Sequence, residues 1–188
     1  MRSIHLRKKW LFLALSAFSL IIGGAFLLRT RPEPSRRLSL WRFTENGVFT
    51  EIQVAEYASG RMKLLGTFTP TREHFHLYSK DLPKGGLNGL GRPTLLEVVS
   101  SDGIKSVGSL AANQPTRNLY IDILRTSFPV YPEGPVTLSF FFELASKDNS
   151  ASMELSVTYM ACSDAKCLPP VIDKRLFVKI PNRILQQQ

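Results

Sequence analysis

Residues 153–170 read MELSVTYMACSDAKCLPP, and this stretch best indicates the fold of the chain. In its first half, Leu155, Val157 and Tyr159 alternate with polar residues, so that the apolar side chains lie on one side of an extended backbone. Such a two-residue period is typical of a strand with one buried face. The strand leads into a turn that holds two cysteines, and two prolines follow, which end strand pairing because proline lacks a backbone N–H.

Similar short runs, rich in β-branched and aromatic residues, continue along the chain from about Ser39 onward, and glycine- and proline-containing turns separate them. Their spacing predicts an all-β fold, an immunoglobulin-like two-sheet sandwich. Residues 80–92 hold four glycines and one proline and are predicted to form a long loop. The predicted strands are residues 49–57, 62–68, 74–78, 94–99, 118–124, 136–144, 153–160 and 175–180.

The N-terminus combines four basic residues with an uncharged run of 19 residues, Trp10 to Leu28. Roughly 20 apolar residues cross a bilayer as a helix. Gly23-Gly24-Ala25 offers small residues for signal-peptide cleavage, but the apolar run continues beyond them, which favours a retained anchor. We therefore expect a signal anchor or transmembrane segment at 1–28, a proline-stiffened linker at 29–38 and a folded domain at 39–188.

The net charge of +9 is concentrated near this membrane segment. Residues 1–28 carry +4 and residues 29–37 carry +3, which leaves +2 for the rest of the chain. The excess positive charge near the membrane can contact anionic lipid headgroups. The rest of the chain has no basic stripe with interleaved aromatic residues, so we expect no nucleic acid partner. The sequence also lacks the phosphate-loop, dinucleotide-binding and hydrolase motifs. It therefore gives no support to a nucleotide-binding or hydrolase function, and we expect no cofactor.

Cys162 and Cys167 are the only cysteines, and four residues separate them. Their spacing leaves three interpretations open: a structural disulfide, a dithiol/disulfide pair that transfers electrons, or part of a metal site. A disulfide that closes so short a loop contributes only about 2 kcal/mol in the chain-entropy treatment. A close pair of this kind is most useful in an oxidising compartment outside the cytoplasm.

The stretch Val157 to Pro170 resembles the active-site segment of the N-terminal periplasmic domain of DsbD, the thiol:disulfide interchange protein. That family has a strand ending in Tyr, a Cys, a short loop with an acidic residue, a second Cys and then Pro-Pro. A second similarity lies upstream, where residues 74–80, HFHLYSK, resemble the Leu-Tyr strand that lies against the cysteines in the family. The family often has an aromatic residue where His76 stands.

The resemblance implies an immunoglobulin-like domain that shuttles electrons between thioredoxin-like partners, with Cys167 forming the mixed disulfide and Cys162 resolving it. It also implies a membrane electron donor. The apolar run within residues 1–28 leads us to expect a single-pass protein of the bacterial inner membrane whose soluble domain lies in the periplasm, and we expect no cofactor. Residues expected to support the pair are Tyr78 and Tyr159 around the sulfurs, Asp164 and Lys166 beside them, and Pro169 at the loop exit.

Two other functions remain possible from the residues themselves. The first is a non-catalytic sandwich for binding or envelope assembly, with a structural disulfide. The second is a copper-handling module, because thiolate and thioether ligands suit Cu(I) and two histidines alternate on one predicted strand. Its candidate ligands are His74, His76, Met160, Cys162 and Cys167. We expect no metal in the preferred function.

Overall fold

A computed structural model describes residue 34 and residues 36–57, 61–146 and 150–181. All of them belong to the second of two units into which the chain divides, Glu33–Gln188. The predicted anchor at 1–28 and most of the predicted linker lie outside the described residues. Within the described part of the chain, no helix has the length and apolar character needed to cross a membrane.

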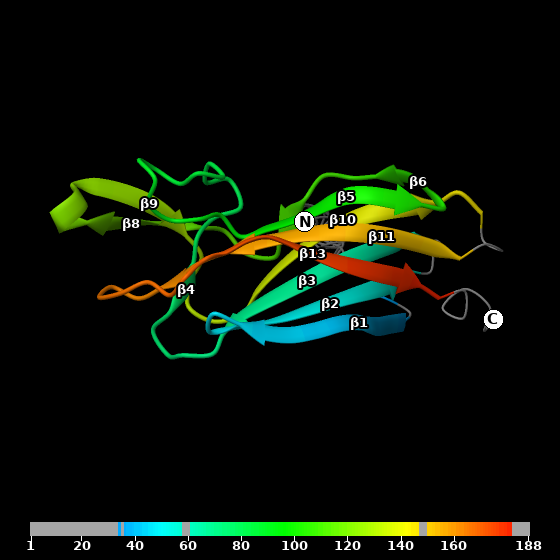
Figure 1. Cartoon of the computed structure of the whole chain (residues 1–188), viewed down its shortest axis with the longest axis horizontal. Coiled ribbons are helices and arrows are strands. Elements are labelled where there is room, and N and C mark those ends of the chain that lie inside the picture. The colour runs from blue at the N-terminus through cyan, green and yellow to red at the C-terminus, as the bar shows by residue number, and fades with distance from the viewer. Residues whose placement is uncertain (1–33, 35, 58–60, 147–149, 182–188) are drawn as a thin grey trace, which may run out of the picture. The chain divides into compact units, whose positions relative to one another are not determined.

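Two antiparallel sheets form the body of the domain (Figure 1). The larger sheet has the order β1-β2-β3-β10-β6, with β7 also paired to β10, and the smaller has the order β13-β11-β5. The bounds in the larger sheet are β1 Arg36–Glu45, β2 Val48–Glu56, β3 Met62–Pro70, β10 Val136–Leu144, β6 Ile104–Val107 and β7 Ala111–Ala112. Those in the smaller sheet are β13 Val171–Ile180, β11 Ala151–Tyr159 and β5 Leu95–Asp102.

The core lies between these sheets and follows the predicted alternation. Leu155, Val157 and Tyr159 of β11 are completely buried in one apolar cluster, together with side chains from β2, β3 and β10 of the opposite sheet. Burial of these side chains is the main driving force for such a sandwich. The prediction of an all-β sandwich is therefore confirmed.

One end of the sandwich carries two short ladders that belong to neither sheet (Figure 1). β12, Ala161–Cys162, pairs with β4, His76–Leu77, and β8, Arg117–Ile121, pairs with β9, Thr126–Val130. A short 3-10 helix, η1, at Asp122–Leu124 closes the β8–β9 hairpin. These elements place the cysteines beside the hairpin.

The observed strands agree with the prediction best in the sheet interiors. β10 has the predicted bounds, and β2, β3, β5 and β11 differ from the predicted ranges by a few residues. The predicted strand at 74–78 shortens to His76–Leu77, and β1 begins at Arg36, ahead of the expected domain boundary. β1, β6, β7, β9 and β12 were not predicted. The last four are short and carry little periodicity, and no residue of β1 is fully buried, so its sequence lacks a clear apolar face.

Candidate functional site

Cys162 and Cys167 are joined in a disulfide with an S–S distance of 2.00 Å. The two residues have very different environments. Cys162, at the end of β12, is only 1% exposed, whereas Cys167 lies on an exposed loop. A thiolate from another protein can therefore reach the Cys167 sulfur much more easily than the Cys162 sulfur.

Backbone hydrogen bonds hold the two cysteines opposite each other. The Ser163 N–H donates to the Lys166 carbonyl at 2.8 Å, and the Leu168 N–H donates to the Ala161 carbonyl at 2.9 Å. The Ser163 hydroxyl oxygen also accepts from the Lys166 N–H at 3.3 Å. Because these bonds do not involve sulfur, the turn has a set of contacts that can keep both thiols close after reduction.

The exit of this turn rests on the β1–β2 hairpin. Asn46 and Gly47 form its two-residue loop, both with positive φ, which is the geometry that two-residue hairpins favour. The Asn46 side chain donates to the Pro170 carbonyl at 3.3 Å. Leu168 lies directly over Gly47, where a Cβ atom would collide with its side chain. Pro169 itself is exposed at this exit.

Tyr78 contacts the sulfurs from the segment that follows β4. Its hydroxyl donates to Cys162 Sγ at 3.3 Å and lies 4.0 Å from Cys167 Sγ. The side chain is 3% exposed, and burial raises its pKa, so that the phenol stays protonated and remains a donor at neutral pH. A Cβ atom at Gly91, whose φ is +74°, would lie 3.2 Å from the Tyr78 ring, so glycine allows the loop to pass close to that ring.

The segment around Tyr78 also joins the cysteines to the β8–β9 hairpin. Tyr78 bridges Val130, the Ser79 N–H donates to the Pro129 carbonyl at 2.8 Å, and the Tyr131 N–H donates to the Leu77 carbonyl at 2.8 Å. The segment that contains β4 and Tyr78 thus pairs with the β8–β9 hairpin on one side and with β12 on the other. A separate small apolar cluster around Cys162 results, which contains Tyr78, Leu82, Phe128 and Val130.

Tyr159, which was expected near the sulfurs, lies in the main core instead. Its ring packs edge-on against Phe68, and its hydroxyl donates to the Glu45 carbonyl at 3.2 Å. The reason is the alternation of β11, which directs Tyr159 between the two sheets while the chain turns toward the cysteines only after Met160. Burial raises the pKa of Tyr159 to about 12.

The structure also corrects the expectation that His74 and His76 share one face of a strand. His74 lies in a turn with φ +63° and its side chain is 82% exposed, whereas His76 lies on β4 and is 2% exposed. Within the described residues, no group of three or more His, Cys, Asp or Glu side chains is placed to hold a metal ion. Both cysteine sulfurs of the copper alternative are joined to each other.

A cavity of about 390 Å³ lies at the cysteine pair. One wall is the cysteine turn, which includes the exposed residues Asp164 and Lys166, and the other is the β8–β9 hairpin with η1. His76 and Tyr78 also line it.

The hairpin is the part of this site that sequence reasoning missed. Residues 118–124 were read only as another strand, yet Tyr120, Ile123 and Leu124 are exposed, Ile123 at 91%. The available signal was the apolar run Tyr120 to Leu124, interrupted only by Asp122, in a segment with no predicted partner.

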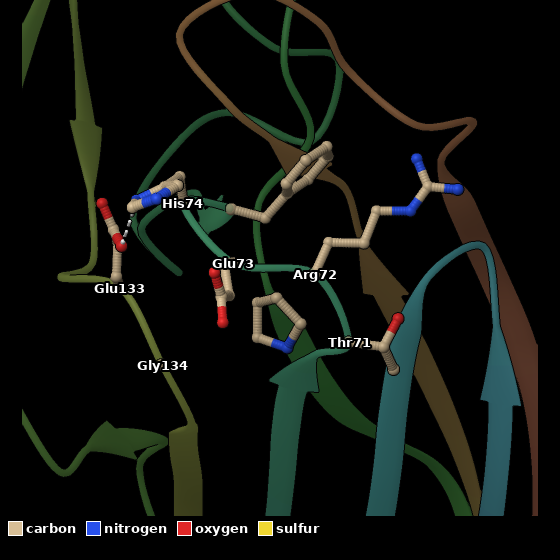
Figure 2. A pocket seen from close by; sticks show the side chains of 8 residues that line it. Thr71, Arg72, Glu73, His74, Glu133 and Gly134 are labelled. Atoms are coloured by element: carbon tan, nitrogen blue, oxygen red, sulfur yellow. Dashed lines mark ion pairs between the residues drawn. The ribbon is translucent and has the colours of Figure 1, made fainter.

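A second cavity, of about 320 Å³, lies between the turn after β3 and the segment before β10 (Figure 2). Figure 2 shows the His74 side chain beside that of Glu133. Their Nδ1 and Oε2 atoms are 3.4 Å apart. Both side chains are largely exposed, so this ion pair contributes little to stability.

No family model matches the chain, and no curated protein matches it. Among solved structures, the chain is similar to the N-terminal periplasmic domain of ScsB from Proteus mirabilis, with 10% identity and a TM-score of 0.46. The match covers 79% of this chain and 53% of that one, so the chain spans about half the length of its structural neighbour. This is a likeness of fold only.

Proposed function

We propose that the chain is an extracytoplasmic thiol–disulfide exchange domain that passes electrons between thioredoxin-like proteins through Cys162 and Cys167. The observation that carries this proposal is the asymmetry of the pair, with one exposed sulfur and one buried sulfur lining the same cavity. Exchange needs an accessible sulfur for attack and a second sulfur close enough to resolve the mixed disulfide.

In the reducing half of the cycle, a thiolate of the electron donor attacks Cys167 Sγ. The Cys162–Cys167 bond breaks, a donor–Cys167 disulfide forms, and Cys162 leaves as a thiolate that takes up a proton. The second donor thiolate then attacks its own disulfide-linked sulfur and releases Cys167. Two electrons and two protons have passed from the donor dithiol to this domain.

In the second half, the Cys167 thiolate attacks a disulfide of the acceptor, and Cys162 then attacks Cys167 Sγ to release the reduced acceptor. Tyr78 stabilises negative charge on Cys162 through its hydrogen bond. Lys166 favours a thiolate at the neighbouring Cys167, Asp164 opposes it, and Pro169 shapes the exit of the turn.

The proposal places this domain in the periplasm, tethered to the inner membrane by residues 1–28, and supplied with electrons by a separate membrane protein. The apolar run from Trp10 to Leu28 with its basic flank supports the tether. A retained tether keeps the full-length chain in the membrane fraction through an alkaline carbonate wash, with its N-terminus near Met1. A soluble product that begins near Phe26 would contradict the tether but not the exchange activity.

Trapping of a mixed disulfide tests the exchange reaction. Cys162→Ser removes the resolving sulfur, so the variant should accumulate a covalent complex with an oxidised thioredoxin-fold protein. Cys167→Ser leaves only the buried sulfur and should trap little. Equal trapping by both variants would contradict the assigned roles, and no trapping by either would favour the non-catalytic sandwich with a structural disulfide.

A further inference from the structure

His76 lies in one row with the two cysteines. The β4–β12 ladder places His76 opposite Cys162, and Cys162 is bridged in turn to Cys167. Directly opposed residues of antiparallel segments project from the same face, with Cβ atoms about 4.5–5.5 Å apart. The imidazole therefore lies on the same face as both sulfurs and next to the buried one.

The imidazole is buried without a complete set of hydrogen bonds. His76 is 2% exposed, and its Nε2 has no hydrogen-bond partner among the described residues. Its ring meets the edge of Tyr78, with centroids 5.9 Å apart, and it lines the cavity that contains both cysteines. A buried polar atom without a partner lowers folding stability, so its presence beside a reactive pair indicates a role in the chemistry.

The surroundings keep this imidazole neutral at physiological pH. Burial lowers the pKa of His76 and Arg117 lowers it further, whereas Asp164 and Glu133 raise it by less. A neutral imidazole has one nitrogen that can accept a proton. Besides Asp164 and the two cysteines, the other titratable groups that line the same cavity are Tyr78, Tyr120, Asp122 and Lys166.

We propose that His76 accepts the proton of the Cys162 thiol in the step that resolves the mixed disulfide, an inference that rests on the exchange function proposed above. The Cys162 S–H bond breaks and its proton moves to the imidazole. The Cys162 sulfur attacks Cys167 Sγ, the Cys162–Cys167 bond forms, and the bond from Cys167 to the acceptor breaks. The acceptor leaves as a thiolate, which takes the proton from the imidazolium or from water.

The expected effect follows from the ionisation of a thiol. An ordinary Cys has a pKa of about 8.5, so only a few per cent is thiolate at about pH 7. A neighbouring base that removes this limit raises the reactive fraction by at most roughly thirtyfold, and we expect roughly a tenfold effect on resolution.

The test uses the reduced full-length chain in detergent micelles and the aromatic disulfide dithiobis(nitrobenzoate). Attack by exposed Cys167 releases the first nitrothiobenzoate in a second-order phase, and attack by Cys162 releases the second in a first-order phase. His76→Phe should slow the first-order phase roughly tenfold at about pH 7 and leave the second-order phase unchanged. The first-order rate of the His76→Phe protein should then keep rising to higher pH, whereas that of the original chain should reach its plateau at lower pH.

Two further variants make the result decisive. His74→Asn alters the exposed histidine nearby and should leave both phases unchanged. His76→Gln keeps a hydrogen-bonding side chain that cannot take up a proton, and it should slow resolution as His76→Phe does. An unchanged first-order phase in either folded His76 variant overturns the inference.

If neither variant folds, the pH profile of the Tyr78→Phe protein decides, because it lacks the hydroxyl that also lowers the Cys162 pKa. In that protein, a first-order phase with an apparent pKa of about 8.5 or higher overturns the inference and a lower one supports it. Failure of the original chain to release any second nitrothiobenzoate would contradict the exchange function itself rather than the role of His76.

Discussion

Replacement of Tyr78 by Phe tests whether the phenol stabilises negative charge on the buried sulfur. The substitution removes one hydroxyl and keeps the ring, which packs against Phe128 with centroids 5.6 Å apart. The lost hydrogen bond is the 3.3 Å contact to Cys162 Sγ, and the 4.0 Å contact to Cys167 Sγ is weaker. The effect should therefore fall mainly on Cys162.

The magnitude follows from the difference between neutral and charged acceptors. A hydrogen bond to a neutral group contributes about 0.5–1.5 kcal/mol and one to a charged group about 1.5–3 kcal/mol. The difference, on the order of 1 kcal/mol, favours the Cys162 thiolate over its thiol. Since one pKa unit corresponds to about 1.4 kcal/mol, Tyr78→Phe should raise the Cys162 pKa by roughly one unit.

Thiolate absorbance measured against pH provides the assay, in a Cys167→Ser background where only Cys162 titrates. Tyr159→Phe is the matched control, because it removes the same group from a buried tyrosine whose hydroxyl binds the Glu45 carbonyl instead. In a Cys162→Ser background, the Cys167 pKa should move by less. Equal Cys162 pKa values in the Tyr78→Phe and Tyr159→Phe proteins would refute the reasoning.

Three further predictions concern stability. Reduction of the disulfide should leave the domain folded and lower its melting temperature by roughly 4–8 °C, because a disulfide that closes so short a loop contributes about 2 kcal/mol. Thermal melts with and without reductant measure this shift, and unfolding on reduction would show that the disulfide is structural. Gly47→Ala should destabilise the domain by about 1–2 kcal/mol from its φ of +72° and also displace Leu168, speeding alkylation of reduced Cys167. Gly89→Ala is the control, with φ +82° and open space around it, and equal alkylation rates in the two variants would argue against coupling between the hairpin and the cysteine turn. Finally, the pKa of Tyr159 in the folded protein, about 12, lies above the ordinary value of about 10. The contribution of Tyr159 to stability should therefore be complete below about pH 10 and decline toward about pH 12. Tyr159→Phe should make alkaline unfolding less steep, and an unchanged unfolding profile would contradict the raised pKa.

The strands and the cysteine pair could be recognised from the sequence because both signals are local. Alternation in β11 and β10 reflects the direction in which successive side chains point along an extended chain, and it needs no knowledge of partners. The spacing of Cys162 and Cys167 across one short turn made a disulfide one of the interpretations that the sequence left open, and the two residues are joined. Tyr78 could be placed near them only through the resemblance of its segment to a known family.

The environment of the sulfurs was decided by tertiary structure alone. Tyr78 and Cys162 are 84 residues apart in the chain, and no local pattern shows that their side chains meet. The same holds for His76, which differs from nearby His74 only because β4 pairs with β12 and buries it. Tyr159 is much closer to Cys162 in sequence, yet the alternation of β11 directs its side chain into the main core between the two sheets, away from the small cluster that contains Cys162. Chemical type thus indicates which groups could react, whereas strand pairing between distant segments determines which of them share a face with the sulfurs.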